Sequence, residues 1–222
     1  MRTSLVLALT PLTLAGCEGD LSILQPAGPA ADAIATLWWV MLAGGTAIFA
    51  FVMAPVALAF RTGGDGKERE RVWIVGLGLA FPLCGLAALL AYGLIVGERP
   101  LPRASTDVVT VQADARQWEW LFGYADIPDM VTRNVLHIPA GRPIDVEITT
   151  ADVIHSFWVP RLAGKLDAMP GRVNVLRLEA DVPGRLSGLS SELSGPGYAG
   201  HGFEIVVHDA EGWRAFPAGE MR

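Results

Sequence analysis

Few side chains in this sequence are suited to metal or redox chemistry. The only cysteines among the 222 residues are Cys17 and Cys84, which excludes a disulfide framework and a cysteine-built zinc site. Two histidines, His155 and His201, and the carboxylate of Glu192 are ligand types that suit Cu(II) or Zn(II). One interpretation is a mononuclear metal site at these three residues. The alternative is that the histidines are hydrogen-bonded core or rim residues.

The composition excludes several classes of protein. Apolar residues make up 51% of the chain and charged residues 18%, and the mean hydropathy is +0.38. These values argue against both an ordinary soluble domain and a disordered chain. The formal net charge of −6 argues against a nucleic-acid-binding protein, which would carry a basic patch.

The N-terminus has the features of a secretory signal. Arg2 supplies the positive charge, and residues 5–14 supply a short apolar run. The sequence Leu14-Ala15-Gly16-Cys17 resembles a lipobox, at which cleavage leaves Cys17 to be diacylated. An ordinary secretory signal with an incidental cysteine is the alternative. We predict a lipoprotein-type signal peptide over 1–16 and a periplasmic segment over 17–33.

Two charge-free stretches, 34–60 and 72–97, are long enough to cross a bilayer, which takes about 20 apolar residues. Segment 61–71 between them carries four Lys/Arg residues. The positive-inside rule places this segment in the cytoplasm. We therefore predict two transmembrane helices over 34–60 and 72–97 and a cytoplasmic loop over 61–71, which returns the chain to the periplasm.

After the second stretch, the pattern changes to short, alternating, β-branched segments separated by Pro–Gly turns. This spacing is typical of an antiparallel sandwich or barrel, and we predict a periplasmic all-β domain over 105–214. The expected strands are Val108–Val111, Asn134–Ile138, Ile144–Ile148, Val173–Leu178 and Phe203–Val207.

Several motifs together resemble subunit II of the haem-copper respiratory oxidases. They are Leu24-Gln25-Pro26-Ala27-Gly28-Pro29, Leu37-Trp38-Trp39, Gln117-Trp118-Glu119-Trp120, His155-Ser156-Phe157-Trp158-Val159-Pro160, and Lys165-Leu166-Asp167-Ala168-Met169-Pro170-Gly171-Arg172. The resemblance implies a two-helix transmembrane hairpin followed by a cupredoxin-like Greek-key β-barrel. It also implies subunits I and III as partners, with the haems and CuB in subunit I.

In the cytochrome c-oxidising members of that family, the barrel holds a dinuclear copper centre, CuA. Its loop has the pattern Cys-x-Glu-x-Cys-Gly-x-x-His-x-x-Met, and an earlier histidine completes the ligands. The cysteine positions are here Ser190 and Ser194, the histidine position is Tyr198, and the methionine position is His201. Of the side-chain ligands only His155 is retained. Because hydroxyls do not select Cu(I) as thiolates do, the resemblance implies that CuA is lost and that the chain has no cofactor of its own.

The motifs do not agree on one branch of the family. The run Ser194-Gly195-Pro196-Gly197-Tyr198-Ala199-Gly200 resembles quinol oxidases, whose subunit II has lost CuA. By contrast, His155, Glu192 and the segment 165–172 resemble the cytochrome c-oxidising branch. The resemblance therefore leaves the electron donor open between quinol and cytochrome c.

Three further positions match functional residues of the family. Trp118 matches the electron-entry tryptophan, although without CuA a packing role is favoured. Glu192 matches a ligand to a magnesium ion shared with subunit I, or is a surface acid. Glu70 matches an acid at the mouth of a proton channel in subunit I, although a solvated charge within the basic loop is the favoured interpretation.

The sequence thus predicts subunit II of a terminal oxidase in a bacterial inner membrane. The complex would reduce O₂ and translocate protons, and this chain would serve as a non-catalytic, structural cap. Quinol is the favoured donor, and membrane lipid is a further partner. The alternatives are subunit II of a cytochrome c oxidase and a membrane-anchored periplasmic copper-handling or assembly protein. The lack of Met-rich or His-rich tracts argues against the copper-handling protein.

Overall fold

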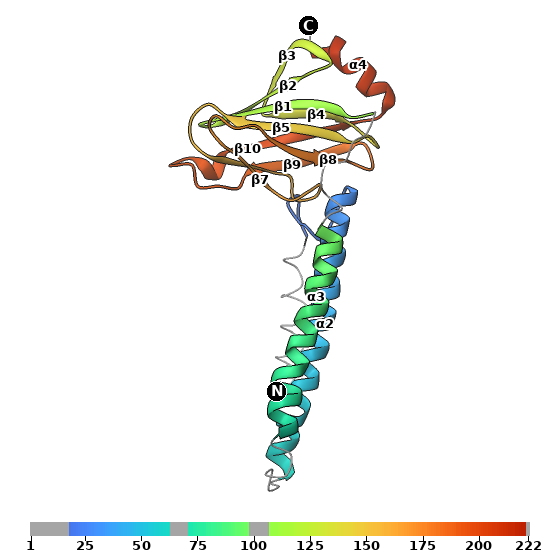
Figure 1. Cartoon of the computed structure of the whole chain (residues 1–222). Coiled ribbons are helices and arrows are strands. Elements are labelled where there is room, and N and C mark those ends of the chain that lie inside the picture. Colours follow the sequence, from blue (N-terminus) through green and yellow to red (C-terminus); the bar gives the residue numbers. More distant parts are fainter. Residues whose placement is uncertain (1–17, 63–70, 98–106, 221–222) are drawn as a thin grey trace, which may run out of the picture. The chain divides into compact units, whose positions relative to one another are not determined.

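The computed structural model describes residues 18–62, 71–97 and 107–220 (Figure 1). The described residues form two compact units: a helical unit of residues 36–62 and 71–97, and a β-rich unit of residues 18–35 and 107–220. The predicted signal peptide, Cys17, Glu70 and most of the predicted cytoplasmic loop lie outside the described residues.

The helical unit contains most of α2 (Pro29–Thr62), the π-helix η3 (Val72–Ala80) and α3 (Phe81–Gly97). The spans Pro29–Arg61 and Val72–Ile95 are long and apolar enough to cross a membrane. Helix α2 begins earlier than the charge-free stretch at 34–60, because Pro29 suits the first turn of a helix. Side chains such as Phe49, Phe60 and Leu90 are exposed in the isolated chain, as expected of surfaces that face lipid or another subunit.

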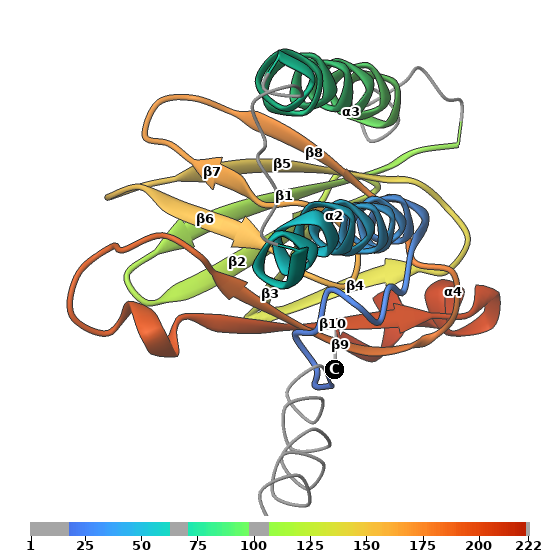
Figure 2. The same cartoon turned by 90° about the horizontal axis from the view of Figure 1, so that it is seen from below.

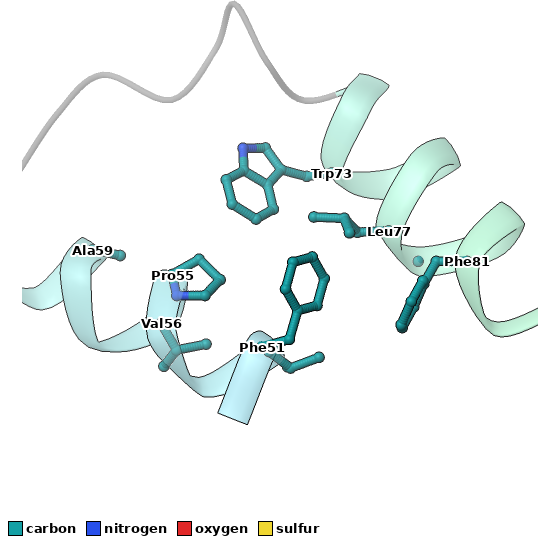
Figure 3. Close-up of a pocket in the computed structure, with 9 residues that line it drawn as sticks. Phe51, Pro55, Val56, Ala59, Trp73, Leu77 and Phe81 are labelled. Carbon is teal, nitrogen blue, oxygen red and sulfur yellow. The ribbon is translucent and has the colours of Figure 1, made fainter. Parts of the chain in front are cut away.

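An apolar cleft of about 490 Å³ lies within the helical unit (Figure 3). Phe51 and Pro55 line it from α2, and Trp73, Leu77 and Phe81 line it from η3 and α3. Pro55 lacks a backbone N–H and so interrupts the regular hydrogen bonding of α2. The facing turns of η3 are wider than α-helical turns. The two helices therefore present an uneven apolar surface around the residues that line this cleft.

The β-rich unit is a sandwich of two five-stranded sheets (Figure 1). The first sheet has the order β3-β2-β1-β5-β8, with strands β1 (Val109–Arg116), β2 (Glu119–Tyr124), β3 (Ile127–Arg133), β5 (Ile144–Thr150) and β8 (Asn174–Leu178). The second has the order β4-β10-β9-β6-β7, with strands β4 (Val135–Pro139), β6 (His155–Trp158), β7 (Leu166–Ala168), β9 (Gly184–Ser190) and β10 (Gly202–His208). The 3₁₀-helix η4 (Tyr198–Gly200) precedes β10, and α4 (Ala210–Glu220) follows it.

The expected all-β fold is confirmed, but its pairing is not wholly antiparallel. Strand β1 is parallel to β5, and β4 is parallel to β10. The prediction of an antiparallel sandwich is therefore wrong at these two pairs. Hairpin turns join only antiparallel neighbours, whereas parallel pairs need longer crossovers.

Aromatic rings fill the core between the sheets. Trp120, Phe157 and Phe203 are buried, with ring centroids 4.8–5.5 Å apart. Strand β9 supplies Gly188 opposite this cluster, where an added Cβ would lie 2.3 Å from the Phe203 ring. Such a short distance leaves no space for a side chain, so the glycine lets the backbone of β9 pack directly against the aromatic core.

Residues 24–31, here called the strap, are joined to the sandwich by backbone hydrogen bonds (Figure 2). Ala27 N–H donates to the carbonyl of Arg161 at 2.7 Å, and Asp181 N–H donates to the carbonyl of Ala27 at 2.9 Å. In the first turn of α2, Ala31 N–H donates to the carbonyl of Leu162, which satisfies a donor that has no partner within the helix. Segments that precede and follow the helices in sequence thus form one folded unit.

Candidate functional site

Two histidines meet inside the sandwich. His155 begins β6 and His201 lies directly before β10; their side chains are 0% and 1% exposed. Their ring centroids are 4.9 Å apart and the ring planes are nearly perpendicular. Strand β9 positions both, because Ser190 pairs with Phe157 of β6 and its N–H donates to the carbonyl of His201 at 2.8 Å.

The orientation of the His155 ring is set by Asp152. Burial would raise the pKa of Asp152, but the hydrogen bond from His155 and those from the N–H groups of Gln117 and Val153 outweigh it and lower this pKa to about 2. Asp152 is therefore ionised at neutral pH and can only accept hydrogen bonds. Nε2 of His155 donates to its Oδ1 at 2.9 Å, so in the neutral imidazole Nδ1 carries the lone pair.

His201 is a neutral ring in an aromatic setting. Burial lowers its pKa, and the nearby His155 lowers it further, while the Glu119 backbone and the Asp152 carboxylate act in the opposite direction. The ring stacks on Trp120 at a centroid distance of 5.5 Å. Neither of its ring nitrogens makes a hydrogen bond of acceptable geometry.

Unsatisfied polar atoms concentrate at this point. Within the described part of the chain, seven buried side-chain nitrogen or oxygen atoms have no hydrogen-bond partner. Four of them belong to three rings in mutual contact: Nε1 of Trp120, Nδ1 of His155, and both ring nitrogens of His201. Each such atom costs about 1–3 kcal/mol when it is left unpaired. The three rings thus form a buried cluster in which four nitrogen atoms lack a protein partner.

The end of β9 and the loop that follows it provide hydroxyl groups. Ser190 is buried, and its Oγ accepts from Ser156 N–H at 3.3 Å. Ser194 is also buried, and its Oγ has no partner. Tyr198 is 40% exposed. Of the positions expected to have replaced CuA ligands, Ser190 and Tyr198 are thus joined to His201 by backbone hydrogen bonds, and all three carry hydroxyl groups.

Glu192 does not join the histidines. Its side chain is 42% exposed, and its Oε2 lies 3.8 Å from Nζ of Lys165. Residues 18–62, 71–97 and 107–220 contain no group of three or more His, Cys, Asp or Glu side chains that could hold a metal ion. The structure thus brings together two members of the predicted mononuclear set and leaves the third apart.

The turn between β1 and β2 is fastened to this loop. Nε2 of Gln117 donates to the carbonyl of Ser194 at 2.6 Å, and N–H of Gln117 donates to Asp152 at 2.8 Å. Trp118 is 36% exposed. It covers Gly197, which has a φ of +110° and where an added Cβ would lie 3.0 Å from the indole. Trp118 therefore closes the rim above the histidine pair.

Asp152 was not identified from the sequence, although the Asp–x–x–His spacing of Asp152 and His155 was a signal for it. A second histidine pair lies elsewhere in the sandwich: His137 Nδ1 and His208 Nε2 are 2.8 Å apart, and Phe216 of α4 stacks on both rings. This pair differs from His155 and His201 because its nitrogens meet each other.

A ten-stranded sandwich with two parallel pairs, joined to two long apolar helices, defines a membrane-anchored cupredoxin-like protein. The family model described as "Cytochrome C oxidase subunit II, periplasmic domain" matches residues 129–210. The chain is 30% identical over 213 residues to quinol oxidase subunit 2 of Bacillus cereus, covering 90% of this chain and 73% of that protein. It belongs to the cytochrome c oxidase subunit II family.

Other relatives carry both kinds of oxidase name. Cytochrome c oxidase subunit 2 of Alkalihalophilus pseudofirmus is 29% identical over 97% of this chain and 67% of its own length. The crystal structure of the periplasmic domain of subunit II of cytochrome oxidase of Bradyrhizobium japonicum superimposes with a TM-score of 0.50 at 28% identity, covering 54% of this chain and 96% of that domain. This chain is accordingly an oxidase subunit II of the cytochrome c or quinol type, and sequence identity alone does not separate the two.

Proposed function

We propose that this chain is the structural subunit II of a haem-copper terminal oxidase that oxidises quinol and that it holds no CuA centre. The observation that carries the proposal is the set of donor groups at the end of β9 and in the loop after it. Ser190, Ser194 and Tyr198 offer hydroxyl groups where bridging thiolates are needed to bind two copper ions and share an electron between them. Cys17 and Cys84 both precede the β domain in the sequence.

Without CuA the chain has no relay for an electron entering from the periplasm. In this proposal quinol delivers electrons within the membrane to the haems of subunit I, which with CuB reduces O₂ while protons are translocated. This chain is not catalytic. Its exposed apolar helices pack against subunits I and III and lipid, and its sandwich caps the periplasmic face. Trp118 then packs on the loop rather than passing electrons.

The hydrogen bonds of the strap support the proposed topology. Because Ala27 and Asp181 are directly bonded, the segment before α2 and the domain after α3 lie on the same side of the membrane, so the chain crosses it an even number of times. The basic segment 61–71 places its own side in the cytoplasm of a bacterial inner membrane. Cys17 is then available for acylation in the periplasm.

Two family positions supply secondary roles in this proposal. Glu192 is partly exposed and only loosely paired with Lys165, so its carboxylate can reach a Mg²⁺ ion shared with subunit I, a hard cation that prefers oxygen ligands. Glu70 would collect protons at the cytoplasmic edge.

The test is the donor preference of the purified complex that contains this chain. We expect rapid O₂ consumption with a ubiquinol analogue and none with reduced cytochrome c, compared against a cytochrome c oxidase assayed in parallel. Rapid oxidation of cytochrome c by the complex alone would refute quinol as the donor. Two copper ions per chain with a purple mixed-valence spectrum would refute the loss of CuA.

A second candidate is a cytochrome c-oxidising complex. Retention of His155 and Glu192, and the match to a cytochrome c oxidase subunit 2 over 97% of the chain, favour it. The same assay decides between the two.

A further inference from the structure

We propose that His155 and His201 form a binding site for a single divalent ion of the Cu(II) or Zn(II) type. This site differs from CuA in its ligands and in the number of ions, and it has no thiolate. The proposal holds whichever donor supplies the complex.

The first support is the way in which His155 is held. Histidines that bind a metal through one nitrogen commonly donate the other N–H to a carboxylate, which fixes the ring and strengthens its lone pair. Here Nε2 of His155 bonds Asp152 at 2.9 Å while Nδ1 is buried without a partner. Asp152 also accepts from the backbone of Gln117 and Val153, so the carboxylate is itself fixed.

The second support is the availability of His201. Its ring is 1% exposed, and neither ring nitrogen makes a hydrogen bond of acceptable geometry. Its position is held by stacking on Trp120 and by the hydrogen bond from Ser190 to its carbonyl. A buried imidazole that is held in place but not hydrogen-bonded is a ligand that needs little reorganisation to bind an ion.

The third support is the distance between the rings. An ion about 2.0–2.1 Å from an imidazole nitrogen lies about 3.2 Å from the ring centroid, so two rings bound at an angle of about 100° have centroids about 4.9 Å apart. The observed separation of His155 and His201 is 4.9 Å. The two rings therefore lie within the separation that one ion bound to both of them requires.

The remaining ligands are oxygen atoms. No third His, Cys, Asp or Glu side chain joins the pair among the described residues, so water completes the coordination. The unpaired Nε1–H of Trp120 supplies a donor for such a water. The Asp152 carboxylate lies beside the site, hydrogen-bonded to His155 at 2.9 Å.

The second histidine pair provides a matched control. His137 and His208 are bonded to each other at 2.8 Å, and Phe216 stacks on both rings, so their facing nitrogens are already engaged. Four histidines occur in the chain, two in each pair, and each pair can be altered independently.

The test is a Cu(II) titration of the full chain in detergent, after treatment with a chelator, in a Cys17→Ser, Cys84→Ser background. We expect saturable binding of one ion per chain and an electron paramagnetic resonance spectrum with hyperfine coupling to two imidazole nitrogens. The His155→Gln and His201→Gln variants should lose this signal, and the His137→Gln and His208→Gln variants should keep it.

Two further measurements distinguish loss of the ion-binding site from misfolding of a variant. Asp152→Asn retains both ligands and should weaken Cu(II) binding about 10- to 100-fold. Zn(II) should raise the Tm of the unaltered chain but not that of His201→Gln. No saturable binding, or equal binding by the unaltered chain and His155→Gln, would overturn the proposal. Two coppers with a mixed-valence spectrum would overturn both this site and the proposed loss of CuA, whereas one copper together with cytochrome c oxidation would overturn only quinol as the donor.

Discussion

Replacing Asp152 with asparagine removes the negative charge that joins His155, at the start of β6, to the β1–β2 turn. The carboxylate accepts hydrogen bonds from His155 Nε2, Gln117 N–H and Val153 N–H, at 2.6–2.9 Å. Asparagine has almost the same shape but only one acceptor oxygen. The substitution therefore tests charge and hydrogen bonding with little change in packing.

The lowered pKa of Asp152 gives the size of the expected loss of stability. A fall from 3.8 to about 2 corresponds to about 2.4 kcal/mol of stability at neutral pH. Because the side chain is 31% exposed, solvent screening reduces this value, and we expect Asp152→Asn to cost about 1–2 kcal/mol. The contribution is complete above about pH 5 and is lost as the pH falls through about 2, since the depressed pKa favours the charged form in the folded state.

Thermal unfolding of the full chain in detergent with chelator, followed by near-ultraviolet circular dichroism of the aromatic core, measures this effect. We expect the Tm of Asp152→Asn to be lower by about 4–10 °C at pH 7 and the difference to disappear near pH 2. Asp114→Asn is the control, because Asp114 is similarly exposed (30%) but forms only a surface ion pair with Arg116, which is worth less than about 1 kcal/mol. Equal losses in both variants, or a difference that persists at pH 2, would contradict our account.

Two other predictions concern the strap and α4. Gly28→Ala places a Cβ 1.9 Å from the carbonyl oxygen of Glu179, so it should destabilise the β-rich unit by about 1–3 kcal/mol and speed amide exchange in the strap. Gly164→Ala, where nothing lies within 4 Å of the added Cβ, should do neither. Equal exchange in the two variants would argue against close packing at Gly28. Burial lowers the pKa of His208, with Asp209 opposing, so its neutral form is favoured on folding and stability is lost as the pH falls below about 6.5. The protection factors of the α4 amides, which correct for the intrinsic pH dependence of exchange, should be lower at pH 5 than at pH 7, and His208→Gln should remove most of that difference.

The sequence was most informative where hydrophobic patterning alone decides structure. Charge-free stretches located the helices, and the β-branched segments correspond to β1, β4, β5, β8 and β10. Strand β9 (Gly184–Ser190) was missed because its glycines and serines have low β-propensity. It forms because β10 and β6 pair with its two edges, a tertiary effect that propensity does not capture.

The site was predicted less completely than the fold. The motifs grouped His201 with His155, and the structure brings the two rings to a centroid distance of 4.9 Å because the strand order fixes both. Asp152 escaped notice because its partner Gln117 is 35 positions away in sequence and becomes a neighbour only when β1 pairs with β5. Glu192 was grouped with the histidines by ligand type alone, and the structure places it beside Lys165.

The strap imposes an order on how the chain is made. Gln25, whose carbonyl accepts a hydrogen bond from Arg161 Nε, lies 136 positions before that partner. It is synthesised before either helix and gains this partner only after the chain has been made as far as Arg161. The β-rich unit is therefore complete only after both helices have been made, so a chain in which one helix fails to insert has the two segments on opposite sides of the membrane and exposes the backbone groups that the strap would pair. A quality-control protease could distinguish such a chain from a finished one.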